Sequence, residues 1–258
     1  MTEESEQVVA DRCHDAAMPQ TKRNLGINPE ISPRDEMLCG NRDYYFLVGQ
    51  SALHCVDTAL QAAGRDRSEV QTILDLPCGH GRVMRYLRAA FPHAEMTACD
   101  LLSDGVDFCA TTFGASRLYS REKVEDIPLP PGSFDLVWVG SLFTHLSAEL
   151  WSRWLLLFHK SLRPAGVLIF SFHGRDAYHR ATNKLLNYGL ADPDLSEILT
   201  RFRADGFGYA DYPHANSFGI SFARPDWVFR QIAATDFRII HFAEKQWADH
   251  HDICAVMK

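Results

Sequence analysis

The sequence lacks an excess of basic residues. Its 258 residues include 26 Lys and Arg against 33 Asp and Glu, so the formal net charge is −7 and the pI is near 5.9. Nucleic acids and anionic membranes attract proteins through basic surfaces. Both are therefore poor candidates for a partner, and we expect no binding to nucleic acid or membrane.

A long apolar run is also missing, and the first residues do not show the pattern of a secretory signal. A membrane-spanning helix needs about 20 mainly apolar residues, and a secretory signal opens with a basic region followed by an apolar one. Met1 is instead followed by an acidic, polar stretch. We therefore expect a cytoplasmic protein.

The cysteines lack the spacing of a zinc site, a CxxC motif or a disulfide framework. Their number is odd and they are scattered along the chain. We expect reduced, packed thiols and no metal site. The seven are Cys13, Cys39, Cys55, Cys78, Cys99, Cys109 and Cys254.

The chain does have enough apolar residues for a large core, at 46% of the composition. Residues 1–43 are polar and include three prolines, which predicts a polar N-terminal arm that is partly disordered. From Tyr44 to about Gly64, apolar residues recur at intervals of three and four, as in an amphipathic helix. Residues 44–258 then read as one catalytic domain.

Short apolar runs alternate with helical patterns after that helix. This alternation predicts an α/β fold with a doubly wound, mostly parallel seven-stranded sheet and helices on both faces. The runs expected to form its first five strands are Thr72–Leu76, Glu95–Cys99, Arg117–Ser120, Phe134–Val139 and Val167–Phe172.

The alternation stops after Gly174. Residues 175–225 are rich in aromatic and polar types, which indicates a cap inserted after the fifth strand. A helix over Pro225–Ala234 and two closing strands, Phe237–Phe242 and Asp252–Met257, are expected next. The loop between these strands allows an antiparallel hairpin.

The end of the first strand carries the clearest chemical signal. Ligands of doubly wound sheets lie beyond the carboxyl ends of the strands, where Asp75 and the turn Gly79-His80-Gly81 are expected. Glycines let backbone approach a ligand, and a helix starting near Arg82 would offer free N–H groups. Asp75 would then hold an ammonium group, and Asp100, after the second strand, would accept hydrogen bonds from ribose hydroxyls.

A nicotinamide-binding fold places glycines and an acid at the same two positions. Its fingerprint has a third glycine three residues after the second, and this chain has Met84 there. A GxG pair alone does not decide between a nicotinamide cofactor and another ligand that contains a ribose and an ammonium group.

Three segments taken together resemble the class I S-adenosylmethionine methyltransferases. They are Asp75-Leu76-Pro77-Cys78-Gly79-His80-Gly81-Arg82, Phe134-Asp135-Leu136-Val137-Trp138-Val139 and Leu162-Arg163-Pro164-Ala165-Gly166-Val167-Leu168-Ile169-Phe170. The resemblance covers Thr72 to Gly174 and implies S-adenosyl-L-methionine as cofactor. Pro77 and Ala165 depart from it, because the family usually has glycine at both positions.

The resemblance also implies a set of cofactor-binding residues. Gly79 would offer backbone to the amino acid end, Asp100 would bind ribose and Leu101 would pack on adenine. Ser120, Glu125 and Asp126 compete for the adenine amine. The full predicted set is Asp75, Pro77, Cys78, Gly79, Gly81, Arg82, Asp100, Leu101, Ser120, Gly140 and Ser141.

Catalysis needs little beyond alignment, because the sulfonium donor is already activated. A hydroxyl acceptor would benefit from a base, for which His145 and His173 are the candidates. Alternatively, either histidine has only a structural role and forms local hydrogen bonds. His250 and His251 precede Asp252, but neighbouring strand residues face opposite ways, so we expect no shared metal site.

Aromatic residues are candidates for the acceptor pocket. Tyr44 and Tyr45 lie where an N-terminal arm would fold over the cofactor, and Tyr209, Tyr212 and His214 lie in the expected cap. An aromatic lining suits a small, partly apolar acceptor. The alternative is that these side chains form the core of the cap itself.

The sequence therefore predicts a methyltransferase that acts on oxygen or nitrogen of a small molecule, as in secondary metabolism. One alternative is a catalytically silent cofactor-binding or partner-binding protein of the same fold. Another is an NAD-dependent oxidoreductase. The oligomeric state is left open between monomer and homodimer.

Overall fold

A seven-stranded sheet forms the centre of the molecule. The structure, a computed structural model, describes residues 25–213 and 218–258. The strand order is β3-β2-β1-β4-β5-β9-β8, and β9 runs antiparallel to both of its neighbours, β5 and β8. The other pairs are parallel, so the predicted α/β sheet with its antiparallel closing hairpin is confirmed. The strands are β1 (Thr72–Asp75), β2 (Glu95–Asp100), β3 (Ser116–Tyr119), β4 (Phe134–Val139), β5 (Leu162–Phe172), β8 (Arg238–Trp247) and β9 (His251–Met257).

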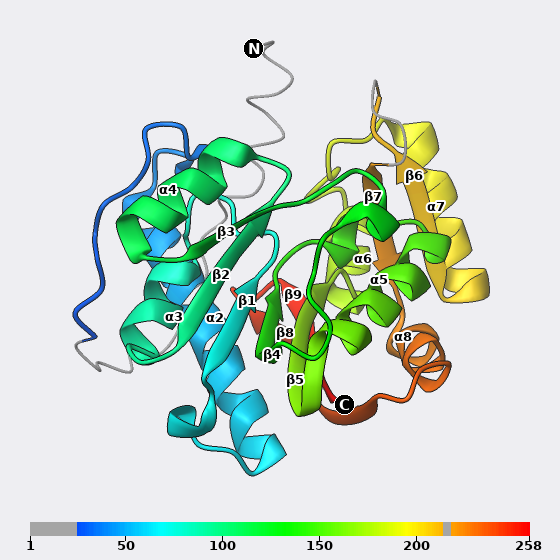
Figure 1. The fold of residues 1–258 in the computed structure, drawn as a ribbon. Helices are drawn as coiled ribbons and strands as arrows, with labels where there is room; N and C mark the ends of the chain where they lie inside the picture. The colour runs from blue at the N-terminus through cyan, green and yellow to red at the C-terminus, as the bar shows by residue number, and fades with distance from the viewer. Residues whose placement is uncertain (1–24, 214–217) are drawn as a thin grey trace.

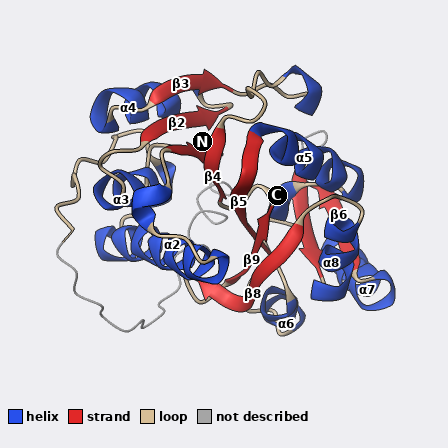
Figure 2. Cartoon of the chain, turned by 60° about the horizontal axis from the view of Figure 1, so that its bottom comes forward, coloured by secondary structure: helices blue, strands red, loops and turns tan. Residues whose placement is uncertain are grey.

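Helices cover both faces of this sheet (Figures 1 and 2). The helices α2 (Arg42–Ala63), α3 (Met84–Ala90) and α4 (Ser103–Phe113) pack on one face. The helices α5 (Ala148–Ser161) and α8 (Pro225–Ala233) pack on the other. Successive residues of β1, β4 and β5 belong alternately to the two cores, as expected for strands that are buried on both sides.

Helix α2 matches the first predicted helix closely. The Asn41 side chain caps it by accepting a hydrogen bond from the Tyr44 N–H, and Gly64 ends it with a φ of 68°. Gly49 lies where α2 crosses the start of α3. A Cβ atom at this position would lie 2.3 Å from the Arg82 carbonyl oxygen, so the close crossing requires glycine.

The described part of the N-terminal arm is docked on α3. Arg85 is only 1% exposed, and it donates hydrogen bonds to the carbonyl oxygens of Asn28, at 3.0 Å, and Glu30, at 2.7 Å. A short 3-10 helix, η1 (Glu36–Leu38), then leads into α2. Backbone carbonyls fix this segment, and a composition-based prediction does not detect such contacts.

The expected cap lies between β5 and α8. It contains α6 (Arg175–Thr182), α7 (Asp192–Asp205) and the hairpin of β6 (Phe207–Asp211) and β7 (Gly219–Ala223). Phe202, Ile220 and Phe222 are among the residues that form its own small core. Strand β7 holds the cap against the ends of β4 and β5, because the Ser221 hydroxyl donates to the Phe143 carbonyl and the Ala223 N–H donates to that of His173.

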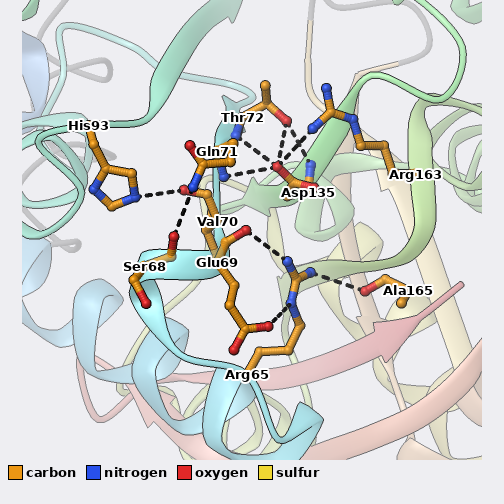
Figure 3. A network of polar contacts seen from close by, with 10 residues as sticks. All are labelled: Arg65, Ser68, Glu69, Val70, Gln71, Thr72, His93, Asp135, Arg163 and Ala165. Atoms are coloured by element: carbon orange, nitrogen blue, oxygen red, sulfur yellow. Dashed lines mark hydrogen bonds and ion pairs between the residues drawn. The ribbon is translucent and has the colours of Figure 1, made fainter.

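A polar network closes the amino end of the sheet, opposite the expected site (Figure 3). The Asp135 carboxylate accepts hydrogen bonds from the N–H groups of Gln71 and Thr72 and from the Thr72 hydroxyl. It also pairs with Arg163 at 3.1 Å. The short helix η2 (Arg67–Glu69) precedes this network. Asp135, in the segment Phe134–Val139, therefore joins β1, β4 and β5. It lies at the end of the sheet away from the expected ligand site.

Two further expectations concern the whole chain. Within the two described segments, no helix has both the length and the apolarity needed to cross a membrane. Of the six cysteines in these segments, five are buried and Cys39 is half-buried. Cys13 lies outside the described residues.

Candidate functional site

A glycine-containing loop joins β1 to α3 at the carboxyl end of the sheet. Gly79 and Gly81 have φ values of 50° and 80°, a region that favours glycine. A Cβ atom on Gly79 would meet nothing within 4 Å, whereas one on Gly81 would lie 2.3 Å from the Phe113 ring. The loop therefore has open space above Gly79 and tight packing beneath Gly81. Helix α3 begins at Met84, two residues later than the predicted start near Arg82.

Asp100 fastens this loop to the end of β2. One carboxylate oxygen accepts from the Gly79 N–H at 2.8 Å, and the other accepts from the Leu102 N–H at 3.0 Å. Burial acts to raise the pKa of Asp100, and these backbone hydrogen bonds act against that increase. Each carboxylate oxygen has a second lone pair, so Asp100 can hold the loop and still accept a hydrogen bond from a ligand hydroxyl.

Asp75 is a buried acid without a hydrogen-bond partner among the described residues. It is 1% exposed, and neither carboxylate oxygen has a partner there. Its pKa is raised well above its ordinary value, first by burial and then by the Asp100 charge. A buried polar group that lacks a partner is costly. A ligand ammonium, directly or through water, would supply the missing donors.

The residues after β2 give this site an apolar side. Leu101 and Leu102 are 62% and 56% exposed, although they follow the buried end of the strand. The exposed leucines fit the base of a nucleoside, and the Asp100 carboxylate beside them fits its ribose.

Several other residues that were predicted to bind the cofactor lie around this loop and contact other parts of the protein. Cys78 is buried, and its Sγ lies 3.4 Å from the Gly79 carbonyl oxygen. Pro77 and Arg82 are half-buried on either side of the glycines. Ser120 is buried, and its backbone N–H donates to the Asp100 carbonyl. Of its rivals for the adenine amine, Glu125 forms an ion pair with Arg153.

The end of β4 brings Gly140 and Ser141 to the same edge. A Cβ atom on Gly140 would lie 2.8 Å from the Trp247 ring, so this position has no room for a side chain. Ser141 has a φ of 64°, and its N–H donates to the Ser171 hydroxyl at 2.8 Å. These contacts join the ends of β4, β5 and β8.

His145 ends η4 (Phe143–His145) beneath the cap. Its Nδ1 lies 2.7 Å from the Gly219 carbonyl oxygen. A carbonyl can only accept, so Nδ1 carries the proton, and Nε2 is the proton-accepting nitrogen of the neutral ring. Phe218 stacks on the imidazole with ring centroids 4.8 Å apart. The cap hairpin therefore fixes both the tautomer and the plane of His145.

His173, directly after β5, lies beside two further histidines. Its ring centroid is 4.8 Å from that of His251 and 5.3 Å from that of His250. Burial and the neighbouring imidazoles lower its pKa well below the ordinary value. The alternation expected for His250 and His251 does not apply, because His250 lies in the turn before β9. The three side chains form one cluster.

The predicted acceptor residues are divided between the surface and the core. Tyr212 has its ring 6.0 Å from His145, and Tyr209 lines a cavity of about 710 Å³ between β6, the start of α5 and η3 (Val124–Asp126). Tyr44 is half-buried at the start of α2. Tyr45 is fully buried and donates to Asp35 at 2.6 Å, which places it in the interior. His214 lies outside the described residues.

Sequence reasoning missed the residues that orient these histidines. Ser171 lies 3.1 Å from His251 Nδ1, and the Tyr188 hydroxyl lies 3.5 Å from His250 Nε2. Ser171 is one of the alternating residues of β5, and Tyr188 belongs to the cap. No local pattern distinguishes either residue from its neighbours.

Comparison with known proteins finds a match to one family model. This model, described as "Methyltransferase domain", matches residues 73–166. A fatty-acid O-methyltransferase of Mycolicibacterium smegmatis is 31% identical over 137 residues, which cover 52% of this chain and 47% of that protein. A malonyl-[acyl-carrier protein] O-methyltransferase of Pseudescherichia vulneris is 30% identical over 140 residues, which cover 51% and 54%. This chain thus spans about half the length of the curated relatives it matches.

Solved structures agree on the fold. A 1,6-didemethyltoxoflavin-N1-methyltransferase of Burkholderia thailandensis, solved with S-adenosylhomocysteine, has a TM-score of 0.55 at 15% identity, over 81% of this chain and 78% of that one. Human N-acetylserotonin methyltransferase, solved with S-adenosylmethionine, has a TM-score of 0.51 at 15% identity, over 87% and 53%. At these identities the likeness concerns the fold alone.

Proposed function

We propose that this chain, whose residues 73–166 match a methyltransferase domain model, is a class I S-adenosylmethionine-dependent methyltransferase and transfers the methyl group of this cofactor to oxygen or nitrogen of a small molecule. The observation that carries the proposal is the buried Asp75 carboxylate, which has no described partner and lies beside the glycine loop held by Asp100. An ammonium group and a pair of ribose hydroxyls match these two acids. The proposal includes a cytoplasmic location, in keeping with the odd number and scattered positions of the cysteines in the sequence.

The cofactor supplies an activated methyl group, and the chain supplies its position. In this proposal Asp75 meets the ammonium, Gly79 and Gly81 border the amino acid end, and Asp100 accepts from the ribose hydroxyls. Leu101 packs against the adenine. Alignment and the exclusion of water then provide most of the catalysis.

Oxygen is the favoured acceptor atom. Two of the relatives are named O-methyltransferases, and His145 has the tautomer that a base for a hydroxyl group requires. Nε2 of His145 would take the proton that a hydroxyl acceptor loses when it is methylated. Tyr212 and Phe218 would border the acceptor on the side of the cap.

Calorimetry with S-adenosylmethionine, S-adenosylhomocysteine and NAD tests the cofactor. We expect both sulfur compounds to bind. Asp100→Asn should weaken their binding by about 1.5 to 3 kcal/mol, because a charged acceptor of hydrogen bonds is lost. Asp135→Asn is the matched control, since Asp135 is also a buried acid and lies near the start of β4, whereas Asp100 ends β2.

Two outcomes would contradict this assignment. Binding of NAD without either sulfur cofactor would favour the oxidoreductase, and an unchanged affinity in folded Asp100→Asn would remove the ribose role. A screen of cell extracts with methyl-labelled cofactor then finds the acceptor. Cofactor binding without any labelled product would favour the catalytically silent alternative.

The base is tested with the acceptor found in that screen. His145→Gln should lower kcat by roughly 10² to 10⁴, and cofactor affinity should remain unchanged. A variant that keeps the wild-type rate would show that His145 only shapes the pocket.

A further inference from the structure

The cluster of His173, His250 and His251 arises from the topology of the sheet. Strand β9 runs antiparallel to β5, so the residues after β5 meet those before β9. One nitrogen from each ring lies within 4.8 Å of one nitrogen from each of the others. Three imidazoles from two distant parts of the sequence thus converge on one point at the carboxyl end of the sheet.

One of these nitrogens has no described partner. His173 is 5% exposed, and its Nδ1 makes no hydrogen bond within the described residues, whereas the Ser221 backbone forms a hydrogen bond with the same ring. That bond uses Nε2–H, since a backbone carbonyl only accepts. Nδ1 is therefore a buried lone pair that needs a proton donor or a Lewis acid.

All three rings are suited to donating a lone pair. A neutral imidazole offers one ring nitrogen as a ligand and keeps a proton on the other. The Ser171 hydroxyl lies 3.1 Å from His251 Nδ1, and a hydrogen-bonding neighbour of this kind is typical of histidines that bind a metal.

The surrounding charges balance. Arg180 pairs with Asp176 at 2.6 Å, and Lys245 pairs with Asp249 at 3.0 Å. These four groups are the charged neighbours that influence His250. Their fields largely cancel, so a cation at the cluster faces little net repulsion.

We propose that His173, His250 and His251 bind a divalent transition-metal ion of the zinc class. Imidazole is a preferred ligand of these ions, and three histidines leave a coordination position for water or substrate. Zn–N bonds of about 2.0 to 2.1 Å in a tetrahedral site bring ligand nitrogens to about 3.4 Å from one another. The half-buried rings of His250 and His251 would rotate to close the remaining gap. Metal binding does not depend on methyl transfer.

The test uses untagged protein that has been treated with chelator and then titrated with Zn²⁺ in competition with a chromogenic chelator. We expect one tight Zn²⁺ per chain. His250→Gln and His251→Gln should each weaken binding by about tenfold or more, and the double variant should lose the site. His54→Gln is the matched control, because His54 is exposed on α2.

Co²⁺ gives a second readout that is independent of activity. Its visible absorption should report a site with nitrogen ligands in the wild type and in His54→Gln, and the signal should be absent from the double variant. If His173→Gln folds, it tests the buried ligand as well. If it does not fold, the variants at His250 and His251 are enough to test the proposal. An absence of tight Zn²⁺ binding, or equal affinity in the double variant, would overturn the proposal and leave the cluster as a water-bonded or acceptor-bonded group.

Discussion

Buried aspartates differ in how many donors surround them. Asp135 accepts from two backbone N–H groups, a hydroxyl and Arg163. These contacts outweigh the effect of its burial and lower its pKa. Asp252 is 0% exposed and accepts only from the Lys245 N–H, while its second oxygen has no partner within the described residues. Burial therefore raises the pKa of Asp252 to about 7.

The raised pKa makes stability depend on pH in a defined direction. The folded chain binds a proton at Asp252 more readily than the unfolded chain, so the free energy of unfolding falls as the pH rises toward about 7. Asp252→Asn should remove this dependence. When the pH is raised from 5 to 8, the free energy of unfolding measured in urea should fall by about 2 to 3 kcal/mol more in the wild type than in the variant.

Asp43→Asn is the control for this measurement, because Asp43 is exposed in the first turn of α2. It should follow the wild-type dependence on pH. Parallel curves for wild type and Asp252→Asn would mean that Asp252 titrates in the folded protein as it does in the unfolded chain.

Between elements, the crossing of α2 over α3 depends on one small residue. A Cβ atom on Gly49 would lie 2.3 Å from the Arg82 carbonyl oxygen and 2.6 Å from the Tyr86 ring. Backbone cannot rotate out of the way as a flexible side chain can. Gly49→Ala should therefore lower the free energy of unfolding by about 1 to 3 kcal/mol, which thermal or urea unfolding would measure.

Gly26→Ala serves as the comparison, since a Cβ atom there meets nothing within 4 Å. Its stability should match that of the wild type or slightly exceed it. If Gly49→Ala were as stable as Gly26→Ala, α2 and α3 would be free to move apart without cost, and the close crossing would not be a constraint.

At the scale of the whole molecule, local patterns predicted the sheet well. Phe134–Val139 was predicted with the bounds that β4 has, and Gly64 was expected where α2 ends. Alternation and turn residues act over a few positions, and those positions carry their signal in the sequence. The glycine loop belongs to the same class, because its residues are contiguous.

Contacts between distant segments were not predictable in the same way. The strand rule separated His250 from His251, but the rings lie 5.0 Å apart because His250 belongs to a turn. Tyr45 looked like a residue facing a ligand, and it is buried against Asp35 and Arg85. Both outcomes depend on packing between elements, which a periodicity does not encode.

The position of β9 has a consequence for how the molecule folds. This strand follows β5 and β8 in the sequence, yet it lies between them in the sheet. Until it is inserted, β5 presents an unpaired, apolar edge of the kind through which chains associate with one another. Its pairing joins Val167 with Met257, a contact of high sequence separation that slows folding. A chain that is arrested before this step would therefore be prone to aggregation, and solubility during synthesis depends on how soon β9 pairs.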